Sequence, residues 1–282
     1  MKGEQSIGML CELLGVSRSG YYRWEQSRPT RRQSEDEVLS ERIMAAHRRG
    51  RGNYGAPRIV EELRAEELRI SKRRCARLMK SKGLRGRKKH RRRPKTTDSA
   101  HAHPAAANLL GQGASPNGPD QVWITDITYV QTGEGWLYLA ALLDAWSRRV
   151  VGWACSTTLQ VSLVLAALAR ATQNRRPPPG LVHHSDRGVQ YACGEYRAAL
   201  TSKRMVCSMS RKANCYDNAS MESFWSTLKT ETGLDQATPI SRRAAELIIF
   251  DYIETFYNPT RRHSSLGYLS PVAFENQNQT AA

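Results

Sequence analysis

Apolar residues repeat with two different periods along the chain, and the change falls near residue 120. Before residue 96 they recur at three- and four-residue intervals, which predicts helices, whereas "QVWITDITYVQT" (121–132) alternates in the manner of a strand. Residues 97–119 are rich in Ala, Pro, Gly, Ser and Asn without a sustained period, so we expect a linker there. The chain is therefore predicted to hold a helical part followed by a part built on a sheet.

The stretch "MLCELLGVSRSGYYRWEQ" (9–26) has the outline of a helix-turn-helix. A short apolar helix precedes a turn at 15–17, and a second helix is predicted to begin near Ser17. An ordinary helical hairpin that touches no nucleic acid would show the same short pattern, so both interpretations stay open.

A second pair of helices is predicted over 56–66 and 71–83. Pro57 marks a helix start, and Ile59 and Leu63 share one face. The last helix is expected to be capped by Ser71, to turn Cys75, Leu78 and Met79 towards a core, and to spread Lys72, Arg73, Arg74, Arg77 and Lys80 over its remaining surface. Such a surface suits a recognition helix in a DNA groove and equally suits a solvated basic face.

The part after residue 120 reads as strands and helices in mixed order. Strands are predicted at 121–132, 136–146, 148–156, 181–186 and 205–210, and helices at 161–173, 194–202, 218–230 and 241–257. Three meandering strands followed by strand-helix alternation indicate an α/β fold, a mixed sheet with helices on its faces.

Charge separates the same two parts. Of the formal net charge of +17, residues 1–99 hold 27 Lys+Arg against 12 Asp+Glu, and residues 100–282 hold 16 against 14. The run "RGRKKHRRRPK" (85–95), which includes Lys88 and Arg91, has eight cations in eleven residues. A basic part joined to a nearly neutral one suggests that the first binds a polyanion, with nucleic acid as the first partner to consider.

The sequence does not favour a membrane protein, a secreted protein or a zinc-finger protein. The uncharged stretch 150–169 is interrupted by Ser, Thr and Gln, which favours a buried strand and helix over a membrane span. The N-terminus lacks the apolar run of a secretory signal, and the six cysteines form no CxxC pair, so we expect a cytoplasmic protein with reduced thiols and no zinc site.

Three acidic residues are candidates for metal-dependent chemistry, and the first of them lies where an uncompensated acid is costly. Asp126 interrupts the first strand, Asp186 ends the fourth, and Glu222 lies in the first turns of a later helix, with 59 and 35 residues between them. Carboxylates from two strands and a helix are the hard ligands that a pair of Mg²⁺ ions needs to cut a phosphodiester without a nucleophilic side chain.

Chemistry alone does not select these three. Asp144 also stands at a strand end, where it has the alternatives of pairing with Arg148 or capping the next turn, and Asp217 suits a helix N-cap. Asp186 taken singly reads as a turn residue and Glu222 as a surface acid.

A family resemblance narrows the choice. The blocks "WITDITYV", "LLDAWSRRVVGW", "HHSDRGVQY", "SMSRKANCYDNASMESFWSTLKTE" and "FYNPTRRHSSLGYLSPVAFE", with "LGVSRSGYYRW" and "RGNYGAPRIVEELR" upstream, closely resemble OrfB-type transposases of bacterial insertion sequences, relatives of retroviral integrases. The resemblance implies an RNase H-like catalytic core with Asp126, Asp186 and Glu222 as DDE ligands of two Mg²⁺ ions, Mn²⁺ being a substitute. It leaves Asp144 a structural role.

The same resemblance implies DNA contacts. Lys229 lies two helical turns after Glu222 and Asn218 one turn before it, so all three share a face, and in the family a basic residue at the Lys229 position contacts transposon-end DNA. We expect the further DNA-binding residues to be Arg211, Lys212, Arg73, Arg74, Arg77, Lys88 and Arg91, with ordinary surface charge as the alternative. His184 either orients Asp186, touches DNA, or is a satisfied strand-end histidine.

These observations lead to one expected organisation: a helix-turn-helix-like segment (1–34), a second helical DNA-binding region (35–96), the linker, the catalytic core (120–258) and a C-terminal tail (259–282).

The function expected is a DNA transposase that cleaves insertion-sequence ends and transfers the 3′-hydroxyl to a new strand. Its expected partners are double-stranded DNA (terminal inverted repeats and target), further copies of the chain on paired ends, and an upstream-frame partner or fusion, in a nucleoid-associated setting without a membrane. No sustained heptad and no His/Cys zinc module are visible, so the chain reads either as a downstream frameshift product or as a complete variant. The rival hypotheses are a nuclease that only hydrolyses and a DNA-binding regulator with an inactive core.

Overall fold

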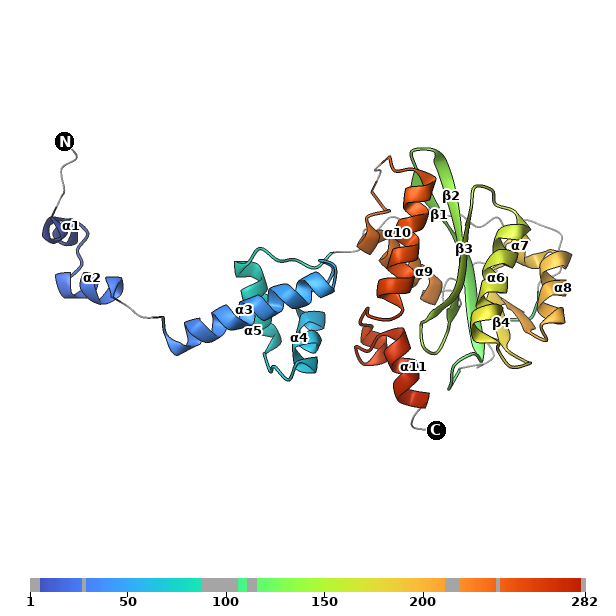
Figure 1. The fold of residues 1–282 in the computed structure, drawn as a ribbon, viewed down its shortest axis with the longest axis horizontal. Coiled ribbons are helices and arrows are strands. Elements are labelled where there is room, and N and C mark those ends of the chain that lie inside the picture. Colours follow the sequence, from blue (N-terminus) through green and yellow to red (C-terminus); the bar gives the residue numbers. More distant parts are fainter. Residues whose placement is uncertain are drawn as a thin grey trace. The chain divides into compact units, whose positions relative to one another are not determined.

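The chain divides into two compact units, residues 1–85 and 86–282, and each is described by itself (Figure 1). The structure is a computed structural model that describes residues 6–26, 29–87, 106–110, 116–210, 219–236 and 239–279. Within these ranges no helix is both long and apolar enough to cross a bilayer.

The first unit begins with the predicted helical pair. Helices α1 (Ile7–Leu13) and α2 (Arg18–Glu25) are joined by a turn in which Gly15 has φ of 66°. The Ser17 hydroxyl accepts a hydrogen bond from the amide of Gly20 at 3.0 Å, which caps α2 as its sequence position predicts. Cys11 is the one residue of these two helices that is buried.

Three further helices of this unit share a core. They are α3 (Arg31–Arg49), α4 (Ala56–Ala65) and α5 (Lys72–Ser81). The predicted core residues are confirmed, since Ile59, Leu63 and Cys75 are fully buried and Leu78 and Met79 nearly so. Ser71 caps α5 and Pro57 lies in the first turn of α4, also as predicted. Helix α3 adds Ile43 to this core, and its start is fixed by a reciprocal capping box between Thr30 and Gln33.

The second unit is built on a five-stranded mixed sheet in the order β3-β2-β1-β4-β5. Strands β1, β2 and β3 form an antiparallel meander, while β4 pairs parallel to β1 and β5 parallel to β4. All five predicted strands are present, as β1 (Val122–Thr132), β2 (Gly135–Asp144), β3 (Val150–Ser156), β4 (Val182–Ser185) and β5 (Val206–Met209). The predicted α/β class with an RNase H-like mixed sheet is therefore confirmed.

Helices cover both faces of this sheet (Figure 1). One face packs against α6 (Val161–Arg175), α7 (Val189–Ala192) and α8 (Gly194–Ser202). The other lies under α9 (Ala219–Thr232), α10 (Arg242–Phe250), a π-helical continuation (Asp251–Tyr257) and α11 (Pro271–Gln279). Because side chains alternate along a strand, Trp123 and Thr125 of β1 point into the α6 layer and Asp126 towards α9.

The α6 layer approaches β3 unusually closely at Gly152. A Cβ atom built on this residue would stand 2.6 Å from the carbonyl oxygen of Ala167 and 2.6 Å from the Cβ of Ala171. Only glycine leaves room for the helix backbone at this point.

Two departures from the predicted elements concern the ends of the unit. The helix expected over 241–257 is present, but its second half is π-helical, and α11 and a short 3₁₀ turn (Ser264–Leu266) follow it where only a tail was expected. Residues 106–110 of the expected linker lie along β5, where the amide of Leu109 donates to the Ser208 hydroxyl at 3.0 Å. Residues 97–105 and 111–115 lie outside the described residues.

Candidate active site

Asp126 occupies the middle of β1 on the face that α9 covers, opposite Ala141 of β2. Its Oδ2 atom accepts a hydrogen bond of 2.9 Å from the indole Nε1 of Trp225 on α9. Burial, and after it the negative charges of Asp186 and Glu222, raise the pKa of Asp126 to about 7, against the hydrogen bonds from Trp225 and the Ile127 backbone. Asp126 is thus a buried carboxyl group whose ionisation is opposed by its surroundings.

Asp186 reaches the same region because of strand pairing. In the parallel pair of β1 and β4, Ile124 lies opposite His184, and Asp126 and Asp186 each come two residues after that pair. The amide of Gly188 donates to Oδ1 of Asp186 at 2.9 Å, which holds the carboxylate at the start of the following turn. Two neighbouring strands therefore deliver two acids to one edge of the site.

Glu222 lies in the first turn of α9 and is exposed. Beside Glu222, α9 has an apolar side on which Met221, Phe224, Trp225 and Leu228 are buried. This amphipathic arrangement fixes which way the helix faces and places Glu222 near enough to Asp126 to raise its pKa.

The three carboxylates suit a hard divalent cation by their chemistry. Among the described residues, no group of three or more His, Cys, Asp or Glu side chains is arranged closely enough to hold a metal ion. Magnesium takes few carboxylates and completes its shell with water and phosphate oxygens, so it does not need a closed protein cage. Burial and the neighbouring negative charges both make ionisation of Asp126 costly, and a bound cation would offset that cost.

Lys229 is turned towards the sheet. Its Nζ atom donates to the backbone carbonyl of Tyr129 at 2.6 Å, and burial lowers its pKa while Asp126 opposes that change. A DNA contact by Lys229 stays a prediction. Five other predicted DNA-binding residues lie outside the described residues: Asn218, Arg211, Lys212, Lys88 and Arg91.

The predicted DNA-binding arginines of α5 divide into two kinds. Arg74 and Arg77 both pair with Asp36 of α3, at 2.7 and 2.5 Å, and these hydrogen bonds lower the pKa of Asp36. Arg73 is exposed on the same helix. Two of these three cations therefore also join α3 to α5, and their contact with DNA stays a prediction.

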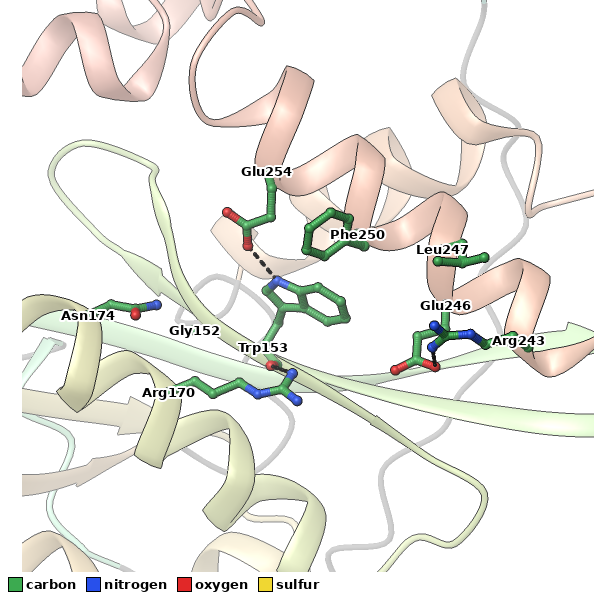
Figure 2. A pocket seen from close by; sticks show the side chains of 9 residues that line it. All are labelled: Gly152, Trp153, Arg170, Asn174, Arg243, Glu246, Leu247, Phe250 and Glu254. Carbon is green, nitrogen blue, oxygen red and sulfur yellow. Dashed lines mark hydrogen bonds and ion pairs between the residues drawn. The ribbon is translucent and has the colours of Figure 1, made fainter.

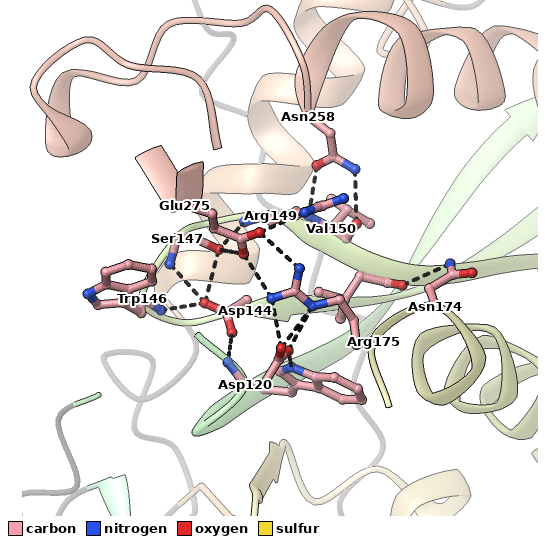
Figure 3. Close-up of polar contacts among 12 residues, drawn as sticks. Asp120, Asp144, Trp146, Ser147, Arg149, Val150, Asn174, Arg175, Asn258 and Glu275 are labelled. Atoms are coloured by element: carbon pink, nitrogen blue, oxygen red, sulfur yellow. Dashed lines mark hydrogen bonds and ion pairs between the residues drawn. The ribbon is translucent and has the colours of Figure 1, made fainter. Parts of the chain in front are cut away.

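The rival carboxylate Asp144 has a structural environment (Figure 3). It is fully buried and accepts hydrogen bonds from the backbone amides of Asp120, Trp146 and Ser147, at 2.7, 3.1 and 2.8 Å. The Asp144 side chain therefore caps the turn that follows β2, which was one of the two structural roles open to it in the sequence; the other was pairing with Arg148. The second rival, Asp217, lies outside the described residues.

Two further features of the sheet are a buried histidine and a pocket beside β3. His184 is fully buried, and its two ring nitrogens lie 2.9 and 3.0 Å from the hydroxyls of Ser208 and Ser210. A pocket of about 480 Å³ opens beside β3, where Trp153 lies between Arg170, Phe250 and Glu254 (Figure 2). None of the predicted site residues lines it.

Sequence reasoning missed an ionic cluster that fastens α11 to the sheet (Figure 3). Glu275 of α11 is almost completely buried and accepts from Arg149 at 2.6 Å, from Arg175 at 2.9 Å and from the Ser147 hydroxyl at 2.8 Å. Arg175 also pairs with Asp120 at 2.8 Å. The partners come from four distant segments, so no local pattern in the sequence announces the cluster.

Comparison with known proteins agrees with this architecture. Residues 116–215 and 203–271 match models of the Integrase core domain, and residues 33–93 match a model of the HTH-like domain. The sheet, the helices on its two faces and these matches define the class, an integrase core preceded by an HTH-like DNA-binding domain.

Two bacterial relatives identify the family. The chain is 47% identical over 274 residues to the insertion element IS600 uncharacterized 31 kDa protein of Shigella sonnei, which covers 97% of this chain and 100% of that protein. It is 41% identical over 279 residues to transposase InsF for insertion sequence IS3A of Escherichia coli (strain K12), covering 98% and 96%. The chain belongs to the IS3 family of insertion-sequence transposases.

Solved structures give weaker likenesses. The HTLV-2 integrase catalytic core domain in complex with magnesium covers 57% of this chain and 99% of that chain, with a TM-score of 0.44 and 16% identity. A simian T-cell lymphotropic virus intasome in complex with a PP2A regulatory subunit covers 66% and 62%, with a TM-score of 0.42 and 17% identity. At these scores they add nothing further to the family assignment.

Proposed function

We propose that this transposase cuts one DNA strand at each end of its insertion sequence and joins the freed 3′-hydroxyl to a second phosphodiester, with Asp126, Asp186 and Glu222 as its metal ligands. One arrangement carries the proposal: Asp126 and Asp186 each follow the paired residues Ile124 and His184 by two positions, and α9, which bears Glu222, contacts the Asp126 carboxylate through Trp225. Buried carboxyl groups with a strongly raised pKa, such as Asp126, are typical of functional sites.

The chain's own residues act by position and charge. Asp126 lies in β1, Asp186 directly follows the adjacent strand β4, and Glu222 lies in the first turn of α9. When bound between these carboxylates, a pair of Mg²⁺ ions, or Mn²⁺ in their place, would activate the attacking oxygen and stabilise the leaving one. No side chain serves as a nucleophile, so catalysis rests on orientation and on neutralising the charge of the phosphate.

DNA is the proposed substrate at both steps, first as the terminal inverted repeats and then as target. Arg73, Arg74 and Arg77 of α5 and the basic run 85–95 supply phosphate contacts from the HTH-like domain, and Lys229, Asn218, Arg211 and Lys212 supply them near the acids. Because two ends must meet, we propose an oligomer on paired ends that works on nucleoid DNA, together with an upstream-frame partner where the element encodes one.

A strand-joining assay on DNA fragments with the element's own ends tests the proposal. Asp186→Asn is expected to abolish both cleavage and joining while DNA binding persists, because Asn removes the charge but keeps the size of the side chain. Asp251→Asn, at an exposed acid of the π-helix, is the matched control and should join strands normally. Joined products from Asp186→Asn would remove the assignment, and hydrolysis products without joined ones in the unaltered protein would favour a plain nuclease.

A further inference from the structure

Trp225 is the residue of α9 that touches Asp126 directly. Its indole Nε1 donates to Oδ2 of the carboxylate at 2.9 Å, and the side chain is 7% exposed. It follows Glu222 by three positions, so the two residues are neighbours along the helix surface. Trp225 therefore lies between an acid of the strand and an acid of the helix.

The chemistry of the indole suits a residue that orients a metal ligand. The indole is a donor and never an acceptor, so it does not compete with the carboxylate for a cation. It is also neutral, so it leaves the charge of Asp126 in place, whereas an Arg or Lys at the same point would cancel it. With Oδ2 held by Nε1, rotation of the carboxyl group about its own axis is restricted.

We propose that Trp225 is a positioning residue, which fixes the orientation of Asp126 relative to the helix that bears Glu222. The inference rests on the proposed function, because it takes Asp126 to be a metal ligand. Hydrogen bonds to ligating carboxylates tune metal affinity, and their removal costs about 10- to 100-fold in affinity or activity.

Other contacts hold α9 in place independently of this hydrogen bond. Lys229 binds the carbonyl of Tyr129 on the same strand, and Arg148 donates to the hydroxyl of Ser220 at the helix start. Farther along, Glu231 pairs with Arg261 at 2.7 Å. Loss of the indole N–H alone is thus expected to loosen Asp126, which still accepts a hydrogen bond from the Ile127 backbone, without detaching the helix.

The test compares two tryptophans that have the same kind of bond. Trp225→Phe deletes the donor to Asp126, and Trp153→Phe deletes a donor to Glu254 that is 2.8 Å long (Figure 2). Trp153 lies on β3, which is separated from β1 by β2, and its indole donates to none of the three acids. Trp153 is also 7% exposed, so the two variants lose equally buried indoles. In full-length protein without DNA, the Mg²⁺ concentration for half-saturation, measured by calorimetry, should rise about 10- to 100-fold for Trp225→Phe and stay unchanged for Trp153→Phe.

Activity provides a second readout. Strand joining by Trp225→Phe should fall at limiting Mg²⁺ and recover as Mg²⁺ is raised, which a variant that is merely misfolded would not do. If Trp225→Phe proves unstable, benzothienylalanine at position 225 keeps the bicyclic shape and removes only the N–H, and it should give the same shift.

The outcomes separate the two proposals. Equal Mg²⁺ dependence of the two Phe variants, with Asp126→Asn inert, overturns the positioning role of Trp225 and leaves the proposed function standing. Joining by Asp126→Asn with unaltered Mg²⁺ binding removes the proposed function and this inference with it.

Discussion

Asp126→Asn is expected to make the metal-free protein more stable above pH 7, although it removes the proposed chemistry. In the folded chain Asp126 is buried near the charges of Asp186 and Glu222, and its pKa is about 7 instead of the ordinary 3.8. Asn matches the neutral acid in size, retains an oxygen for the Trp225 indole, and bears no charge. The substitution therefore relieves a cost that the folded protein bears only when Asp126 is ionised.

The sign of the pH dependence follows from the direction of the shift. A carboxyl group whose pKa is raised on folding stabilises the folded state below its unfolded pKa, and this stabilisation is lost as the pH rises to the folded pKa. The advantage of Asp126→Asn should thus grow between pH 4 and about 7 and level off above it. At about 1.4 kcal/mol per unit the upper limit is about 4 kcal/mol, and because the neighbouring acids share the repulsion we expect about 1–3 kcal/mol.

Urea unfolding of both proteins in EDTA between pH 4 and pH 9 measures this difference. Mg²⁺ should then stabilise the unaltered protein and have much less effect on Asp126→Asn. Asp251→Asn, at an exposed acid, should show no such pH-dependent gain. An Asp126→Asn protein that is less stable at pH 8, or a gain of the same size at every pH, would refute the reasoning that burial and the neighbouring acids raise the pKa of Asp126.

Three further outcomes are expected. Arg261→Met removes the guanidinium from the carboxylate of Glu231; the two side chains are 5% and 7% exposed. Urea unfolding should show a free energy of unfolding lower by about 3–5 kcal/mol, because a buried charge is left unpaired. A loss below about 1 kcal/mol would contradict the burial argument. Gly152→Ala forces a methyl group against the backbone of α6 and should cost about 1–3 kcal/mol by the same measurement, whereas an unchanged midpoint would show that the helix shifts freely. Arg73→Ala should weaken binding to duplex DNA and lower the slope of log affinity against log salt by about 1, and an unaltered slope would remove Arg73 from the interface.

Local periodicity was sufficient to predict the sheet and to single out five candidate acids, and the family resemblance selected three of the five. β1 alternates along its length, and Asp126 stands out because it is an acid within a strand. Helix α3 was not predicted because its buried side consists of Ser40, Ile43 and Ala46, too few large apolar residues to show a period.

Contacts between distant segments could not be read in this way. Arg74 and Arg77 look like free cations in the sequence, yet both pair with Asp36, about 40 positions upstream on another helix. Glu275 is buried because Arg149 and Arg175 come to it from other elements, so the sequence around it suggests only a polar tail. The bond between Trp225 and Asp126 likewise depends on how α9 crosses β1.

The central claim is that Asp126, Asp186 and Glu222 share divalent cations. Anomalous diffraction from crystals of the protein on its end DNA, grown with Mn²⁺, tests it most directly. We predict Mn²⁺ bound by oxygens of all three side chains and lost in Asp186→Asn crystals. Mn²⁺ bound elsewhere, or three carboxylates that face separate regions while DNA is in place, would contradict the claim.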